Sequence, residues 1–255
     1  MAFPRIASII FSSTLLATGA FAESSVTPTY NFSGFSVGLG VGYTHGITND
    51  DTTVTIYSVD QASAEYARDE NISNGLSPIL SAGYHFYIND RWLLGFEGTY
   101  KYTGIQQFNQ FWSGTFTNGT FQQANLYTKF NHEGLLLFNA AYEFQQWLVY
   151  IGAGASLMTL GTTMRGDQLL STSTTFTHTD IKTSKTLWGG AAQAGFEYML
   201  PDRFSVQMFY SFAISATSNL PSVRFQSGSA GYYSEFKQKV QLIDQSIAIT
   251  INKYF

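Results

Sequence analysis

Apolar and polar residues alternate one by one along eight segments of the chain. In the first segment, Phe35, Val37 and Leu39 alternate with serine and glycine. A period of two puts successive side chains on opposite faces of a β-strand, so each segment predicts a strand with one apolar and one polar face. The predicted strands cover about 34–46, 75–88, 92–104, 128–144, 147–161, 186–200, 204–216 and 243–255.

The connections between these strands alternate in length. Three are tight turns, at 89–91, 145–146 and 201–203, and four are long segments, at about 47–74, 105–127, 162–185 and 217–240. Directly opposed residues of an antiparallel pair share a face. The tight turns oppose three apolar pairs: Ile88 to Trp92, Phe144 to Trp147 and Leu200 to Phe204. Turn length and alternation therefore predict the same facing.

Two features of the long connections leave alternatives open. Asn118-Gly119 is a hairpin signal that would join two predicted strands into one ribbon. Its register pairs odd positions with even ones, so it requires either a bulge or a different tip. Residues 53–57 also alternate, so ten strands are an alternative to eight.

The composition and the first residues indicate what surrounds the strands. Arg5, an apolar stretch and Ala20-Phe21-Ala22 predict a secretory signal peptide over 1–22. Charged residues make up 12% of the chain, against roughly 25% in ordinary soluble domains. After the leader, no apolar run reaches the ~18 residues of a membrane helix. Such an exported chain can enter lipid only as a closed barrel, which pairs every backbone group without a helix.

Aromatic residues distinguish a membrane barrel from a soluble sandwich or lipocalin, whose strands also alternate. Aromatics make up 16% of the chain, and they gather beside the tight turns like an interfacial girdle. This set comprises Phe86, Trp92, Phe144, Trp147, Tyr198, Phe204 and Phe255. Tyr43 and Tyr102 fit the outer girdle. Sandwich cores do not gather aromatics at one end of every strand, so the membrane barrel is favoured.

With its leader, the 34–42 stretch GFSVGLGVG, four long loops and Phe255, the chain resembles small bacterial outer-membrane β-barrel proteins of the OmpA/OmpX-like, porin-family group. The resemblance implies an all-β, closed antiparallel transmembrane barrel, with a short periplasmic segment at 23–33 and the barrel at 34–255. It also implies contact with outer-membrane lipid and lipopolysaccharide. In that family the barrel-assembly machinery reads the final strand, which implies this role for Ile247, Ile249, Ile251 and Phe255. Lys253 departs from the family pattern, which usually has an apolar or aromatic residue at that position.

The polar face of the predicted strands supplies the lumen. Eight strands enclose a space only wide enough for side chains to fill. The predicted inward residues include His85, Glu97, Lys101, Lys129, Glu133, Glu143, Glu197, Gln207 and Asp244. These residues can pair with one another as a polar core. Alternatively, they can line a narrow, gated path through the barrel that favours cations. For a path, the gate candidates are Glu97, Lys101, Lys129, Glu133 and Asp244, with Lys101, Glu133 and Asp244 nearest mid-height.

The long connections supply candidate contact surfaces. The second is uncharged and carries Phe108, Phe111, Trp112, Phe116 and Phe121, which could contact a partner or pack on one another. In the third, 171–179 alternates threonine and serine and extends the neighbouring strands. Five bases could meet lipopolysaccharide phosphates or form a solvated rim: Lys182, Lys185, Arg224, Lys237 and Lys239.

The remaining chemistry argues against several function classes. The net charge of −4 argues against nucleic acid, and without cysteine there is no thiolate metal site. The acids of the first long connection lack ligand spacing. The four histidines show no catalytic or zinc spacing, so no enzyme, cofactor or metal is expected. We hypothesise a non-catalytic surface protein that supports envelope integrity and makes contacts through loops 2 and 3. The alternative is a narrow porin passing small solutes or ions.

Overall fold

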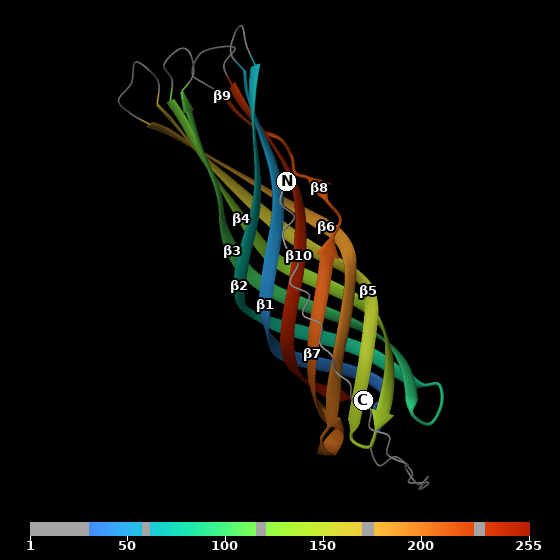
Figure 1. The fold of residues 1–255 in the computed structure, drawn as a ribbon. Coiled ribbons are helices and arrows are strands. Elements are labelled where there is room, and N and C mark those ends of the chain that lie inside the picture. The colour runs from blue at the N-terminus through green and yellow to red at the C-terminus, as the bar shows by residue number, and fades with distance from the viewer. Residues whose placement is uncertain (1–30, 58–61, 116–120, 170–175, 227–232) are drawn as a thin grey trace.

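The computed structural model describes residues 31–57, 62–115, 121–169, 176–226 and 233–255. Its strands form one closed antiparallel ring (Figure 1), in the order β1-β2-β3-β4-β5-β6-β7-β10, with β10 pairing back to β1. The long strands are β1 (Gly34–Tyr57), β2 (Ala62–Tyr87), β3 (Trp92–Thr115), β4 (Phe121–Phe144), β5 (Trp147–Leu169), β6 (Phe176–Met199), β7 (Phe204–Ser215) and β10 (Tyr233–Tyr254). The predicted all-β barrel is confirmed.

The ring has eight strand positions, not ten. Two short strands, β8 (Ser218–Asn219) and β9 (Val223–Gln226), pair with β10 and continue the seventh position beyond β7. Residues 53–57, the source of the ten-strand alternative, are the outer end of β1. The described residues contain no helix long and apolar enough to span a membrane.

The tight turns have the predicted registers. Ile88 N donates to Trp92 O (2.9 Å), and Leu200 N donates to Phe204 O (2.7 Å). Phe144 pairs with Trp147. All six of these side chains lie on the outer face or at its rim, which confirms the predicted facing. The third turn is a 3-10 helix, η1 (Pro201–Arg203).

The predicted long loops are largely sheet. The segment at about 47–74 was predicted as a loop, but β1 runs on to Tyr57 and pairs with β2 along its whole length. The other three long connections are likewise mostly strand. Pairing satisfies backbone groups that a loop would have to leave to water or side chains. The long connections are therefore mostly paired strands, and their residues 58–61, 116–120, 170–175 and 227–232 lie outside the described part of the chain.

The Asn118-Gly119 signal does not set the register of its ribbon. A two-residue turn there requires Thr115 to pair with Gln122, whereas Thr115 pairs with Phe121. The β3–β4 ladder shifts register twice, between Tyr102 and Ile105 and between Phe108 and Phe111. Two irregularities replace the single bulge that the hairpin would need.

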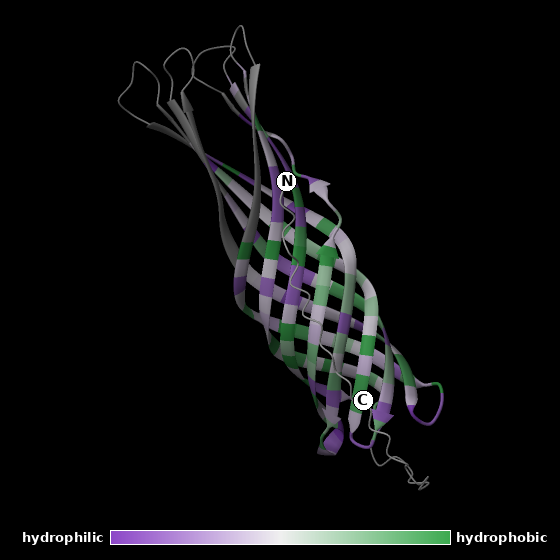
Figure 2. Ribbon diagram, viewed as in Figure 1, coloured by the Kyte–Doolittle hydropathy of each residue, from purple (hydrophilic) through white to green (hydrophobic). Residues whose placement is uncertain are grey.

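A broad apolar band surrounds the lower part of the ring (Figure 2). Leu39, Leu136 and Ile151 belong to the exposed apolar residues and are each about two-thirds exposed. Near the tight turns the band ends in paired aromatics, including Trp147 against Tyr198 with ring centroids 4.7 Å apart. Such a band and girdle are typical of the lipid-facing surface of a membrane barrel.

Above the apolar band, the ring divides into two arms (Figure 1). The β2–β3 ladder stops at Ile79–Lys101 and the β6–β7 ladder at Gly189–Ser215. The β10–β1, β1–β2, β3–β4, β4–β5 and β5–β6 ladders continue outward, and β8 and β9 pair with β10 beyond the end of β7. The first arm consists of β9, β10, β1 and β2, and the second of β3, β4, β5 and β6.

Local sequence explains the division between β2 and β3. Pro78 comes just before Ile79 in the chain, one residue further outward than the last pair, and it has no N–H to donate. Gly104 adopts φ +56°, a conformation that favours glycine, at the register shift where β3 bends to follow β4. Together they end β2–β3 pairing at the top of the band.

Candidate functional site: the filled lumen and the outer arms

The outer half of the lumen is packed with apolar side chains. Leu137, Met158 and Leu160 are at most 1% exposed there. The full cluster comprises Phe130, Leu135, Leu137, Met158, Leu160, Leu187, Ala191, Ala213, Leu220, Val240 and Leu242. Sequence reasoning missed this layer because it treated the inner face as polar, although these residues have inward parity on their strands.

A charged cluster lies beneath this layer. Lys101 Nζ lies 2.5 Å from Glu133 Oε2 and 2.9 Å from Asp244 Oδ1, and all three side chains are fully buried. The ammonium group also donates to Ser246 Oγ (3.0 Å) and Ser211 Oγ (3.3 Å). The structure thus brings together the three residues that sequence reasoning placed nearest mid-height, from β3, β4 and β10. One cation holds two carboxylates, and the group closes the centre of the lumen.

Neutral donors surround two further acids toward the periplasmic side. Glu97 accepts hydrogen bonds from Thr99 (3.1 Å), Asn139 (3.1 Å) and Gln193 (3.4 Å). Glu197 accepts from Asn252 (3.1 Å) and Tyr254 (2.9 Å). These bonds satisfy the buried acids with side chains rather than with an open water path.

Tyr150 links this network across the lumen. Its hydroxyl accepts from Gln193 (2.9 Å) and Gln207 (2.6 Å). Tyr150 and Tyr254 were not among the predicted inward residues. Tyr254 continues the inward parity of Thr250 and Asn252, a signal that was available in the final strand.

Phe32 closes the periplasmic end. Its side chain is fully buried, with its ring 6.2 Å from that of Tyr254 at an angle of 86°. Gly34, at φ +112°, turns the chain from this position into β1, and a Cβ there would lie 2.6 Å from Phe255 O. Of the predicted periplasmic segment at 23–33, the structure describes 31–33, and Phe32 lies in the barrel mouth. Residues 1–30, with the predicted signal peptide, lie outside the described part.

Lys129 does not line the lumen, so its predicted inward placement is wrong. It lies, partly exposed, between buried Thr128 and buried Phe130. The register of β4 against β5 shifts by one residue between Phe130 and His132, which marks a bulge. The extra residue of a bulge reverses which face the residues beyond it lie on. Below the bulge the inward positions of β4 are odd, and above it they are even. The other gate candidates, Glu97, Lys101, Glu133 and Asp244, are buried in the lumen.

The residues of the final strand lie on its outer face. Ile247, Ile249, Ile251 and Phe255 are each about half or more exposed on the apolar band. Lys253, the departure from the family pattern, lies at the periplasmic rim with its Nζ 4.2 Å from the Phe204 ring centroid. An ammonium group over an aromatic face is a favourable placement for a charge at this edge.

The aromatic contact candidates lie at the outer end of the second arm. Phe108, Phe111 and Trp112 belong to β3, and Phe121 begins β4. Phe116 lies outside the described residues, and no side-chain position is described for the other four.

The predicted basic residues cluster where the two arms separate. Lys182, Lys237 and Lys239 are exposed, and Lys185 Nζ donates to Asn219 O (2.5 Å). Glu235 lies within 3.2 Å of both Lys237 and Arg224. The hydrogen bond from Lys237, with a second from Arg224, lowers the pKa of Glu235 below its ordinary value. Asp51 of β1 lies directly opposite Lys239, so acids offset part of the positive charge here.

The histidines are dispersed. His85 is buried in the lumen, His45 Nδ1 pairs with Asn74 Oδ1 at 2.5 Å, and His132 Nδ1 pairs with the Tyr100 hydroxyl at 2.7 Å. No side-chain position is described for His178. Within the described residues, no group of three or more histidines and acids could hold a metal ion.

Comparison with known proteins agrees with this architecture. The family model described as outer membrane protein beta-barrel domain matches residues 12–236. The chain belongs to this family. It is a barrel of the bacterial outer membrane, with its apolar band in lipid. No curated protein matches the chain.

Similar solved structures are small barrels. OprG from Pseudomonas aeruginosa is 11% identical with a TM-score of 0.40, over 88% of this chain and 97% of that one. Neisserial surface protein A is 15% identical with a TM-score of 0.31, over 83% and 97%. The attachment invasion locus protein Ail of Yersinia pestis is 10% identical with a TM-score of 0.23, over 83% and 99%.

Proposed function

We propose that this barrel is a non-catalytic surface protein, which supports envelope integrity and contacts other molecules through its outer arms. The filled lumen is the observation that carries the proposal. An apolar cluster fills the outer half and Phe32 closes the periplasmic end, and between them Lys101, Glu133 and Asp244 are fully buried. A barrel packed in this way has little room for solute passage, so its exposed outer arms are the better candidates for function.

Two partners follow from the same proposal. The barrel-assembly machinery would read the apolar outer face of β10, from Ile247 to Phe255. Lipopolysaccharide would contact the apolar band and the bases above it. Charge-assisted hydrogen bonds between lysine and phosphate support the second contact.

The contact role is tested on the second arm. The assay measures adherence of bacteria that produce the protein to immobilised extracellular-matrix proteins. The variant replaces five aromatic residues with serine: Phe108, Phe111, Trp112, Phe116 and Phe121. Its adherence is expected to fall by about tenfold, because aromatic anchors dominate contact energies. A variant with 58–61, in the first long connection, replaced by alternating glycine and serine serves as the control for a changed connection. Equal adherence by the aromatic variant would contradict the proposed role of these residues.

The charged cluster supports a second candidate function, a narrow porin that passes small solutes or ions. Lys101 is the one base at mid-lumen among the described residues, and it holds the two acids together. If the cluster is a gate, Lys101→Ala raises single-channel conductance in a planar bilayer. Unchanged conductance in that variant favours the filled barrel.

A further inference from the structure

A seam opens in the barrel wall between β6 and the segment that carries β8 and β9. Ala216 N donates to Trp188 O (2.8 Å), the last backbone bond between the sixth and seventh positions. Beyond it, β8 and β9 pair with β10, and in the part of the chain that the structure describes no strand pairs with this edge of β6. Lys185 reaches across to Asn219 O and marks the base of the seam.

The edge of β6 presents backbone donors and acceptors to this seam. N–H and C=O of one strand residue point to the same side, and the side alternates along the strand. Because the Trp188 carbonyl points toward the seventh position and the β5–β6 register is unbroken, the backbone groups of Lys182, Ser184 and Thr186 point into the seam. Those of the odd-numbered residues point toward β5.

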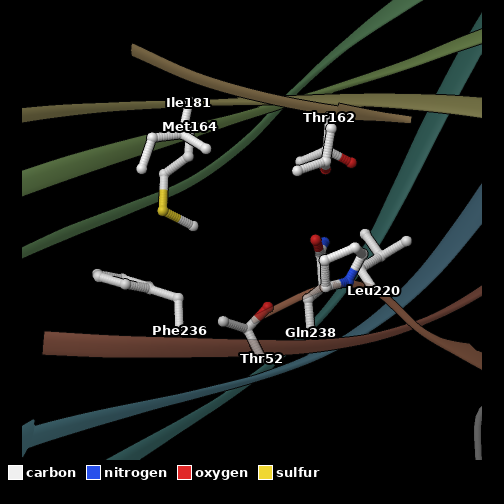
Figure 3. A pocket seen from close by; sticks show the side chains of 9 residues that line it. Thr52, Thr162, Met164, Ile181, Leu220, Phe236 and Gln238 are labelled. Atoms are coloured by element: carbon white, nitrogen blue, oxygen red, sulfur yellow. The ribbon is translucent and has the colours of Figure 1, made fainter. Parts of the chain in front are cut away.

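The inner side of the seam is hollowed (Figure 3). Met164, Ile181, Leu220 and Phe236 supply apolar walls, with Thr183 at the β6 side. The hollow is shallow, with a cavity volume of about 10 Å³, which is room for about one water molecule. The hollow lies where inward side chains of an added strand would point, since Ile181 and Thr183 are the inward residues of β6 at this height.

The surroundings of the seam are positively charged. Lys182 and Lys239 are exposed on either side of it, with Asp51 directly opposite Lys239 on β1. Arg224 and Lys237 share the single carboxylate of Glu235. Arg165 and Asp180 neutralise each other on the second arm, 3.0 Å apart. A strand entering the seam would therefore meet a surplus of cations, which favours acidic residues on its outward face.

We propose that this seam binds an extended, acidic peptide segment of a partner protein, which adds as a β-strand to the edge of β6. Main-chain bonds to Lys182, Ser184 and Thr186 would provide affinity, and the apolar walls of the hollow would favour apolar side chains on the inward face of the peptide. The inference deepens the surface-contact role proposed above and rests on it.

Backbone chemistry favours a peptide over other occupants. The edge alternates donors with acceptors, and a lipid phosphate would satisfy only the donors. A second copy in the same membrane would sit at the same height, so Lys182 would face its own counterpart with like charge. A peptide of alternating apolar and acidic residues satisfies both the edge and the charge.

The seam is tested with a labelled decapeptide of alternating valine and aspartate, added to the protein refolded in neutral detergent. Ser184→Pro removes one seam-facing N–H and leaves the β5 ladder intact, because proline is tolerated on an edge whose N–H faces outward. Ser184→Ala is the matched control that keeps the N–H. Fluorescence anisotropy is expected to show binding that falls about tenfold in Ser184→Pro and is unchanged in Ser184→Ala.

Hydrogen exchange by NMR locates the bound peptide. The amides of Lys182, Ser184 and Thr186 are expected to become protected with the peptide, whereas those of Ile181 and Thr183 are protected throughout. The proposal is overturned by absence of binding, by equal binding of a valine–lysine peptide, or by binding that Ser184→Pro leaves intact. Protection induced by lipopolysaccharide, or by raising protein concentration alone, would overturn it in favour of a lipid or a second copy. Whole-cell adherence is a separate readout, so loss of the general contact role leaves the peptide result interpretable.

Discussion

Replacing Lys101 with methionine is expected to destabilise the barrel by about 3–5 kcal/mol, because the change leaves two buried carboxylates without their cation. Glu133 and Asp244 are both fully buried against Lys101 Nζ. Glu133 Oε1 and Asp244 Oδ2 have no hydrogen-bond partner among the described residues. The hydrogen bond from Ser246 Oγ to Asp244 Oδ1 (2.8 Å) remains, but it does not supply a cation. Urea unfolding in detergent, followed by tryptophan fluorescence, measures the loss.

Lys129→Met is the matched control for this prediction. It removes the same side chain from the outer face of β4, where the expected change is within about 0.5 kcal/mol. Adding Glu133→Gln and Asp244→Asn to Lys101→Met is expected to restore much of the stability, since no buried charge is then left unpaired. Equal stability of Lys101→Met and Lys129→Met would show that the cluster does not stabilise the lumen.

The second large effect is expected at Gly154, where Gly154→Ala should cost about 3 kcal/mol by overpacking. A Cβ at this position would lie 1.9 Å from Leu136 O and 3.0 Å from Leu137 Cα, which are backbone atoms of the neighbouring strand. Backbone cannot rotate away as a side chain can, so β4 and β5 would have to separate.

Gly134→Ala provides the comparison for Gly154→Ala. The nearest atom to a Cβ at Gly134 is Leu157 Cβ, at 4.0 Å, which is ordinary contact. Its unfolding midpoint in urea is expected to match that of the unchanged protein or to rise slightly. A Gly154→Ala variant as stable as Gly134→Ala would contradict the close approach of the two strands.

Alternation and turn lengths predicted eight strands, their facing and three tight turns, because local periodicity determines which face of a strand is apolar. The tall arms were not predicted, since polar alternation in an excursion is equally compatible with a loop. Pro78 and Gly104 were available as signals for the division of the ring, but their effect depends on which strands lie beside them.

The charged cluster was partly predictable and Lys129 was not. Lys101 and Glu133 are directly opposed on neighbouring strands, so counting residues from the tight turns brings them to one height. The bulge beside Asn131 reverses parity before Lys129. A bulge inserts one residue without disturbing the composition of the strand, so residue counting carried across it gives the wrong face.

Planar-bilayer recording of the refolded protein, alongside heat-modifiable gel mobility, tests the central claim of a filled lumen most directly. The expected result is a heat-dependent mobility shift, which reports a folded barrel, with no discrete channel steps. A mobility shift accompanied by regular single-channel steps in the unchanged protein would contradict the filled lumen and favour the narrow porin.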